Sequence, residues 1–378
     1  MTPYSSVIGH QHMVFDKVRN DAYARAILDA ITPESVVLDI GAGLGVLGLM
    51  AAKAGARKVY LVEPQSMGSL TSEVASLNGL VNVECIQATA ETLQLEEKVD
   101  VITSVFTGNF ALTEDLLPSL FLARDRFLKP GGLMLPDLAR MWAVPVTCDK
   151  TVEKYIDIWD GIVTSEDGLG VDYSALKLNA KNTVHYRQFF EKEFTALADP
   201  QMIEEIDFHT AVRAECRSSN SFRLKKTGDC HAWLGWFTAR LGEEWLSTSP
   251  FEPATHWSQA CLPVVPPLIV QGGEEISLQI NRPQFGDWSW RTNYRDQKHL
   301  GTTFLAQEID KGNLRRATEG FRPALDKRGV MTNWLLSRFE GIKSLDSLAT
   351  ELHSQFPVDL PTLEAAQKFV ADLARNYS

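Results

Sequence analysis

A glycine-rich turn between two acidic residues is the part of the sequence whose residue types most clearly suggest chemistry. An apolar run that contains Asp39 leads directly into this turn, which carries Gly41, Gly43 and Gly45. Glycines here would let the backbone approach a ligand closely, because no Cβ stands in the way. Glu63 follows a second apolar run about 20 residues later, where a carboxylate can accept both hydroxyls of a ribose. The pattern predicts the first half of a nucleotide-binding βαβ unit.

The spacing of the turn separates two possible cofactors, a dinucleotide and S-adenosylmethionine. It is G-x-G-x-G rather than the G-x-G-x-x-G of dinucleotide sites. Asp39 directly precedes the turn, where its charge would repel a pyrophosphate but could accept hydrogen bonds from a cationic amino-acid cofactor. We therefore predict S-adenosylmethionine as the cofactor and S-adenosylhomocysteine as the product; the alternative is a turn that only shapes the chain. The predicted contacts here are Asp39, Gly41, Gly43, Glu63 and Pro64.

The elements around the turn predict a doubly wound, Rossmann-like α/β domain over residues 1–136. Further strands are expected at 83–86, 99–104 and 133–136. Helical spacing of apolar residues predicts an N-terminal helix over 10–31 and another helix over 114–128.

Two further regions follow this domain. Short alternating segments such as Met141–Val146 and Cys230–Phe237 predict a β-barrel-like substrate domain over residues 137–305. A helical arm at about 150–198 interrupts it, and an apolar face on this arm could support dimerisation. This face would consist of Tyr155, Ile156, Ile158, Trp159 and Ile162. Helical spacing then predicts a small C-terminal module over 312–378.

Composition and charge argue against several classes of protein. The chain has 378 residues and a net charge of −11, whereas general nucleic-acid binding needs a basic face. No apolar run reaches the roughly 20 residues of a membrane span, and the N-terminus shows no export signal. The five cysteines form no C-x-x-C pair, which argues against a structural zinc site and suits a reducing compartment. We expect a cytoplasmic protein with no metal, nucleic-acid or membrane ligand.

An N-terminal pattern, His-x-x-Met-x-x-Asp-x-x-Arg, accompanies the glycine turn. Its members are His10, Met13, Asp16 and Arg19. Together the two motifs resemble those of the protein arginine methyltransferases. The resemblance implies that Arg19 pairs with the cofactor carboxylate, for which a guanidinium is a natural partner. It also implies that His10 and Met13 line the cofactor pocket, that Ala90 and Glu91 contact the adenine, and that the protein is a homodimer.

The resemblance extends to Thr255-His256-Trp257, which is similar to the family's Thr-His-Trp loop near the active site. It implies that His256 pairs with Asp16, an arrangement that fixes an imidazole in one orientation and could relay a proton. By the same resemblance, Trp257 and Tyr4 contact the substrate.

The loop after the fourth predicted strand departs from the family pattern. Arginine methyltransferases carry two glutamates there, which grip the guanidinium of the substrate. Glu114 matches the second, but Val105 stands in place of the first and cannot accept a hydrogen bond. A charge-assisted hydrogen bond contributes on the order of 1.5–3 kcal/mol, so its loss would weaken guanidinium binding about tenfold to a hundredfold. We predict Glu114 as the main catalytic residue, assisted by His256 and Asp16.

These observations predict an S-adenosylmethionine-dependent N-methyltransferase. Its acceptor would be a guanidino, amine or amide group on a small molecule, a peptide or a protein. Protein arginine N-methylation proper is one alternative, and a non-catalytic scaffold with a methyltransferase fold is a second. A dinucleotide oxidoreductase would explain neither Arg19 nor the Thr255-His256-Trp257 loop.

The C-terminal module lies outside this family resemblance. The spacing of Leu335, Leu336, Leu345 and Leu348 is similar to that of small winged-helix modules of the PqqD kind, which bind leader peptides in peptide-modifying systems. That similarity implies a role in docking a peptide or protein, and the alternative is a purely structural helical cap.

Overall fold

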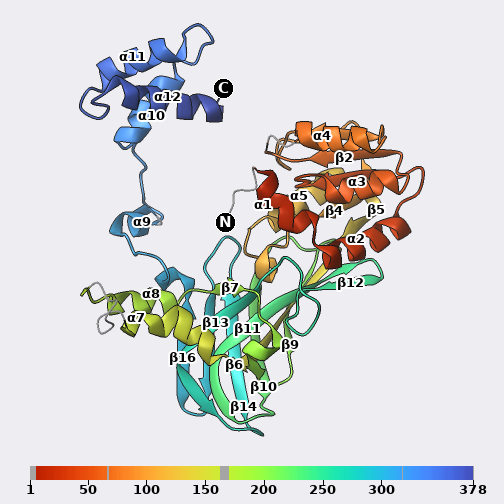
Figure 1. The fold of residues 1–378 in the computed structure, drawn as a ribbon, viewed down its shortest axis with the longest axis vertical. Helices are drawn as coiled ribbons and strands as arrows, with labels where there is room; N and C mark the ends of the chain where they lie inside the picture. Colours follow the sequence, from red (N-terminus) through yellow and green to blue (C-terminus); the bar gives the residue numbers. More distant parts are fainter. Residues whose placement is uncertain (1–5, 66–67, 162–169, 317, 378) are drawn as a thin grey trace. The chain divides into compact units, whose positions relative to one another are not determined.

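The protein divides into two compact units, one ending at Glu308 and the other beginning at Ile309 (Figure 1). The structure is a computed structural model that describes residues 6–65, 68–161, 170–316 and 318–377. The first unit holds both sheet regions, and the second is helical.

The N-terminal part of the first unit is a parallel sheet covered by helices. Its strands are β1 (Val36–Ile40), β2 (Lys58–Val62), β3 (Val83–Ile86), β4 (Val99–Ser104) and β5 (Leu128–Leu135), and its helices include α3 (Val46–Lys53), α4 (Gly68–Leu77) and α5 (Leu117–Phe127). The strand order is β3-β2-β1-β4-β5, and all neighbours run parallel. Every residue of β1 is buried, as expected for the central strand of a parallel sheet. The predicted Rossmann-like fold is confirmed.

Two helices, rather than the predicted single one, precede the sheet. They are α1 (Val7–Val14) and α2 (Lys17–Ala30). The break falls at Asp16, whose Oδ1 accepts a hydrogen bond from the backbone N–H of Arg19 at 3.0 Å and so caps α2. An aspartate that bonds to the backbone in this way favours a helix start over a helix interior. The apolar spacing alone did not show this break.

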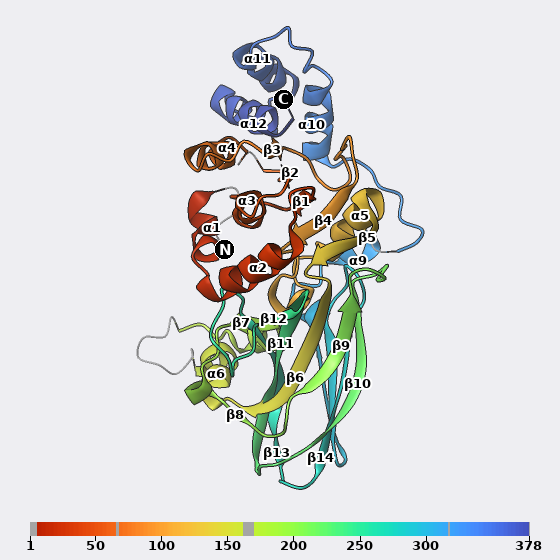
Figure 2. The same ribbon diagram turned by 90° about the vertical axis from the view of Figure 1, so that its right-hand side faces the viewer.

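The β-rich part of the first unit is built from two facing sheets (Figure 2). The strands are β6 (Leu138–Thr147), β7 (His185–Arg187), β8 (Thr195–Ala196), β9 (Gln201–Asp207), β10 (Cys216–Arg223), β11 (Gly228–Leu241), β12 (Glu244–Ser247), β13 (Gln259–Val270), β14 (Glu275–Arg282), β15 (Ser289–Tyr294) and β16 (Gln297–Thr302). The larger sheet follows the path β7-β13-β11-β6-β8, with β12 on β11 and β9 on β6; the smaller has the order β10-β14-β15-β16. The indole N–H of Trp233 on β11 donates to Thr292 on β15 at 2.8 Å, which ties the two sheets together. The predicted β-barrel-like domain is confirmed.

The helical arm is shorter than predicted. It contains α6 (Asp149–Val152), α7 (Ile158–Gly161) and α8 (Lys177–Lys181). The predicted arm continues to about 198, but β7 pairs with β13 from His185 onward and returns the chain to the sheet. Of the predicted apolar face, Ile156 is buried, Ile158 is exposed, and Ile162 lies outside the described residues.

The second unit has its own core. Its helices are α9 (Lys311–Arg316), α10 (Lys327–Leu336), α11 (Leu345–Gln355) and α12 (Leu363–Tyr377). Leu335, Leu352 and Val370 are fully buried where α10, α11 and α12 pack together. The described residues of this unit contain no strand, so they do not include the wing of a winged helix. In the described part of the whole chain, no helix combines the length and the apolar character needed to cross a membrane.

Candidate active site

The glycine turn after β1 has the backbone shape that its sequence predicts. Gly41 and Gly43 have φ values of +72° and +54°, which residues other than glycine rarely adopt. A Cβ built on Gly41 would lie 2.0 Å from the ring of Phe106, and one on Gly43 would lie 2.7 Å from Nε2 of His10. Glu63, at the end of β2, accepts a hydrogen bond from the N–H of Gly43 at 2.9 Å. The turn and this acid therefore lie side by side at the carboxyl ends of the strands.

Two buried charges, Arg19 and Asp39, lie beneath the turn. Oδ2 of Asp39 accepts from the N–H of Gly48 at 2.8 Å, whereas Oδ1 has no hydrogen-bond partner among the described residues. Burial raises the pKa of Asp39 to about 6, and the nearby Arg19 opposes this rise. Arg19 is 2% exposed, and its guanidinium donates to Oδ1 of Asn20. A buried carboxylate and a buried guanidinium suit a ligand that carries both an ammonium and a carboxylate.

A small hollow of about 20 Å³ adjoins this region at the ends of β1, β2 and β3. Its lining residues are Ala42, Gly43, Leu61, Glu63, Gly68, Thr71, Cys85, Ile86 and Gln87. Gln87 also donates to the carbonyl oxygen of Pro64 at 3.2 Å. The sequence reasoning named Gly43, Glu63 and the neighbouring Pro64 but missed Gln87, because it had no motif that covers the residue after β3.

Two predicted adenine contacts, Ala90 and Glu91, do not line this hollow. The carbonyl oxygens of both accept hydrogen bonds from Arg126. The exposed carboxylate of Glu91 accepts from the hydroxyl of Ser119 at 2.8 Å. The predicted bond from Glu91 to the adenine amino group would have to replace or supplement this contact. Met13 is half-buried in α1, and Tyr4 lies outside the described residues.

The predicted pair of Asp16 and His256 is in direct contact. Oδ2 of Asp16 lies 2.7 Å from Nδ1 of His256 and 2.8 Å from its backbone nitrogen. Burial lowers the pKa of His256, although Asp16 opposes this shift. Burial would raise the pKa of Asp16, but hydrogen bonds from His256 and Arg19 outweigh it and lower that pKa. The ring is therefore neutral near pH 7, with Nδ1–H bound to the carboxylate and Nε2 available to accept a proton.

Trp257 supports this histidine from within the core. It is 4% exposed, its ring centroid lies 3.9 Å from that of His256, and it packs edge-on against Phe237. Because Trp257 is buried and packs on His256, we expect it to influence the substrate through His256 and not by direct contact.

The loop after β4 carries Val105 and Glu114. Val105 is partly buried and packs against the core, while Glu114 is exposed and its side chain lies over Gly108. Oδ1 of Asn109 accepts from the backbone N–H of Ser258 at 2.7 Å. We call the loop after β4, residues 105–116, the acceptor loop. The bond joins it to the segment that carries His256, so Glu114 and His256 lie on two connected segments.

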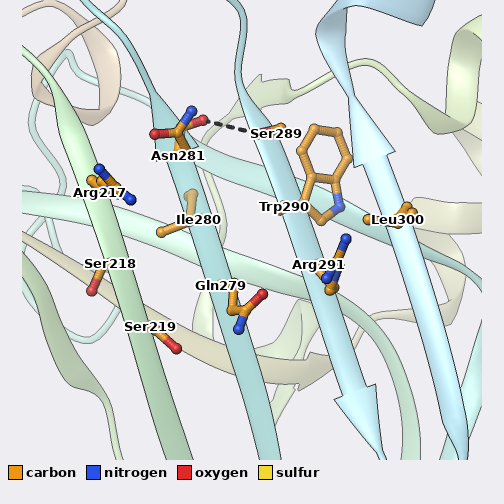
Figure 3. Close-up of a pocket in the computed structure, with 10 residues that line it drawn as sticks. All are labelled: Arg217, Ser218, Ser219, Gln279, Ile280, Asn281, Ser289, Trp290, Arg291 and Leu300. Atoms are coloured by element: carbon orange, nitrogen blue, oxygen red, sulfur yellow. Dashed lines mark hydrogen bonds between the residues drawn. The ribbon is translucent and has the colours of Figure 1, made fainter.

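A larger hollow, of about 670 Å³, lies on the outer face of the smaller sheet (Figure 3). Its lining residues are Arg217, Ser218, Ser219, Gln279, Ile280, Asn281, Ser289, Trp290, Arg291 and Leu300. It shares no residue with the glycine turn or with the loop after β4, and it is not part of the predicted site. The described residues contain no cluster of side chains that could hold a metal ion.

Comparison with protein families accounts for both sheet regions. Residues 37–132 match a family described as a methyltransferase domain, and residues 137–296 match the arginine methyltransferase oligomerization subdomain.

Curated relatives match along most of their length. Protein arginine N-methyltransferase 6 of Danio rerio is 39% identical over 272 residues, which are 68% of this chain and 77% of that protein. Protein arginine N-methyltransferase PRMT10 of Oryza sativa subsp. japonica is 34% identical over 312 residues, which are 73% and 80% of the two chains.

Solved structures agree with these relatives. The Trypanosoma brucei PRMT1 enzyme-prozyme heterotetrameric complex with S-adenosylhomocysteine matches with a TM-score of 0.71 and 26% identity, over 79% of this chain and 99% of that one. Arabidopsis thaliana protein arginine methyltransferase 10 matches with a TM-score of 0.65 and 27% identity over the same shares. The chain belongs to the protein arginine methyltransferase family and is an S-adenosylmethionine-dependent methyltransferase.

Proposed function

We propose that this enzyme methylates a guanidinium nitrogen of arginine in a protein or peptide. The curated relatives are named for this activity. The observation that carries the proposal is the exposed Glu114 on a loop that is bonded to the Asp16–His256 pair through Asn109 and Ser258. The proposal narrows the sequence-based prediction, whose main interpretation left the nitrogen acceptor open and gave protein arginine N-methylation only as an alternative.

On the donor side, the chemistry of the residues fits S-adenosylmethionine. Arg19 would pair with the cofactor's carboxylate and Oδ1 of Asp39 would face its ammonium group, while Glu63 would accept from its ribose hydroxyls. When bound, the cofactor supplies an electrophilic methyl group on a sulfonium. The rings of His10 and Phe106 lie close to Gly43 and Gly41, beside the place where the cofactor would bind.

On the acceptor side, the protein must hold a nitrogen in line with the methyl group and free its lone pair. Glu114 would accept hydrogen bonds from the guanidinium and draw its positive charge toward the carboxylate, away from the attacking nitrogen. Nε2 of His256 would take the released proton, because Asp16 holds the Nδ1–H and stabilises the imidazolium that forms. Alignment supplies most of the rate enhancement in such a displacement.

Val105 supports a second candidate, transfer to another nitrogen such as an amine or amide. An aliphatic side chain partly buried against the core cannot accept from a guanidinium, so one of two expected anchors is missing. An acceptor nitrogen with fewer N–H donors would lose less binding free energy when valine stands in place of the glutamate.

The two candidates differ in their response to Val105→Glu. If arginine is the acceptor, a second carboxylate should raise kcat/KM on an arginine-containing peptide about tenfold, the effect of one charge-assisted hydrogen bond. Val105→Gln is the control for side-chain size. Mass spectrometry of paired peptides that carry arginine or lysine would identify the methylated nitrogen. Methylation of the lysine peptide alone would replace the proposal with the second candidate.

We also propose that the enzyme works as a homodimer that uses the helical arm. The family match over residues 137–296 is to an oligomerization subdomain, and Ile158 on α7 is 53% exposed. An exposed apolar side chain on a short helical arm suits contact with a second copy. Sedimentation equilibrium should show a dimer that Ile158→Lys weakens. A monomer in the unmodified protein would contradict the proposal.

A further inference from the structure

The acceptor loop contains three non-glycine residues whose backbone has a positive φ, a conformation that is unfavourable for residues with a side chain. Phe110, Ala111 and Asp115 have φ values of +51°, +61° and +55°, and none is glycine. Each costs on the order of 1–3 kcal/mol and persists only when its surroundings hold it in place. Glu114 lies directly before the last of the three. Whatever holds this segment therefore also fixes the backbone from which Glu114 projects.

Phe110 is held by the β-rich part of the unit. It is fully buried, and its ring stacks on Trp288 with centroids 5.1 Å apart and an interplanar angle of 25°. The ring also lies close to Gly235 of β11, where an added Cβ would come within 2.6 Å of it. The backbone of Gly235 does not have a positive φ. Glycine is needed at this position because the Phe110 ring occupies the space of a side chain.

Asp115 is held by Arg282, the last residue of β14. Nη2 of Arg282 donates to both carboxylate oxygens of Asp115, at 2.8 and 2.9 Å. Arg282 is 4% exposed, and its guanidinium carbon lies 5.6 Å from the centroid of the Trp288 ring. Its Nη1 has no hydrogen-bond partner among the described residues. Because this buried guanidinium is paired with the Asp115 carboxylate, removing that carboxylate would leave a buried charge unpaired and destabilise the segment.

These contacts grip both ends of the segment. Asn109 is bonded to Ser258, Phe110 packs against Trp288 and Gly235, and Asp115 is paired with Arg282. The partners Ser258, Trp288, Gly235 and Arg282 all belong to the β-rich part of the unit. The parallel-sheet domain also contacts this loop, because Phe106 lies against Gly41. The backbone on both sides of Glu114 is nevertheless held by contacts from the β-rich part of the unit.

We infer that Arg282, Trp288 and Gly235 are positioning residues for methyl transfer, which hold the strained acceptor loop so that Glu114 meets the acceptor nitrogen. They act through Asp115 and Phe110, and none of them lines the hollow beside the glycine turn. The inference rests on the proposed function in that Glu114 faces the acceptor, but it concerns the geometry of the loop whichever nitrogen is methylated.

The ion pair is tested by Asp115→Asn and Arg282→Lys, separately and together. Asparagine tolerates positive φ and has nearly the same size, so Asp115→Asn removes the charge without changing the backbone preference. We expect each variant to lower kcat at least about tenfold while the Kd for S-adenosylhomocysteine changes less than about twofold. Because both changes break one interaction, the double variant should be little worse than either single variant. Unchanged kcat with only a lower Tm would overturn the inference.

The steric contact gives a matched pair of variants. Gly235→Ala pushes a methyl group into the Phe110 ring, whereas Gly272→Ala meets its nearest neighbour at 3.4 Å, an ordinary contact. We expect Gly235→Ala to lower kcat and Gly272→Ala to leave it unchanged. Adding Phe110→Leu to Gly235→Ala should restore part of the loss, because the shorter side chain leaves room for the methyl group. Equal activity of the two glycine variants would contradict the inference.

A readout that needs no acceptor separates this inference from the proposed function. Amide hydrogen exchange in residues 109–115 should speed up in Arg282→Lys and Gly235→Ala, while exchange in β1 stays unchanged. If the unmodified protein methylates no arginine but this exchange still increases, the proposed function fails and the inference stands. If exchange in the loop does not change, the inference fails whatever the acceptor is.

Discussion

The donor and acceptor halves of the active site are assembled in different ways. The donor half, with Asp39, Gly43 and Glu63, is built from consecutive strand-turn-helix segments of one parallel sheet. The acceptor half is a single loop whose shape depends on residues far along the chain, such as Ser258 and Arg282. The comparison teaches that local sequence places the turn after β1 beside Glu63, whereas contacts from a second sheet system hold the loop that carries Glu114.

The strongest test of this difference between the two halves is to remove the guanidinium of Arg19. Arg19→Met keeps an apolar side chain of similar length in the buried site but leaves no partner for the cofactor carboxylate. A bidentate charge-assisted contact is worth about 3 kcal/mol, so the Kd for S-adenosylhomocysteine should rise about a hundredfold in calorimetry. Hydrogen exchange in the acceptor loop should stay unchanged. Cofactor binding within threefold of the unmodified protein would remove Arg19 from the donor half.

Glu114→Gln tests the acceptor half. It keeps the shape of the side chain but removes the charge that localises a guanidinium, so kcat should fall at least about tenfold. The affinity for S-adenosylhomocysteine should not change, because Glu114 does not line the hollow beside the glycine turn. Glu73→Gln, on the exposed surface of α4, is the control. Full turnover by Glu114→Gln would mean that another group orients the acceptor.

The pH dependence tests the histidine that links the two halves. Because burial lowers the pKa of His256 from its ordinary value of 6.5, the ring is neutral above that pH and takes up a proton only below it. We expect kcat/KM to be flat above about pH 6.5 and to fall at lower pH, as the base becomes protonated. His256→Asn should lower the plateau by roughly tenfold and abolish the acidic limb. An acidic limb that survives this substitution would belong to another group.

The smallest expected effect concerns Glu91. Its exposed carboxylate bonds to Ser119 and does not line the hollow beside the glycine turn. Glu91→Gln should therefore change the Kd for S-adenosylhomocysteine by less than about threefold, as expected for an exposed polar contact. A loss of tenfold or more would show that Glu91 turns toward the adenine when the cofactor binds, as the family resemblance implies.

The sequence predicted the strand, the glycine turn and the nearby acid because their determinants are local. The spacing of the glycines and the distance to Glu63 follow from one strand, one turn and one helix, and the contact between Asp16 and His256 agrees with the family motifs. The break at Asp16 was missed because apolar spacing predicts helix on both sides of this residue and does not show where one helix ends and the next begins.

The supports of the acceptor loop could not be predicted in the same way. Nothing local marks Phe110 as a residue with positive φ, and Asp115, whose residue type tolerates positive φ, does not by itself predict it. Their partners Trp288 and Arg282 lie more than 160 residues further along the chain, and only the folded sheets bring them together. The departure at Val105 was visible, but its consequence for the acceptor depends on side chains of the substrate.

One apolar cluster runs without interruption from the parallel sheet, through Phe110, to Trp233 and Ile280 between the two β-sheets. We therefore expect the parallel sheet and the two β-sheets to unfold together as one cooperative unit. A scanning calorimeter should record them melting in one transition, with the C-terminal helices, which have a core of their own, melting separately.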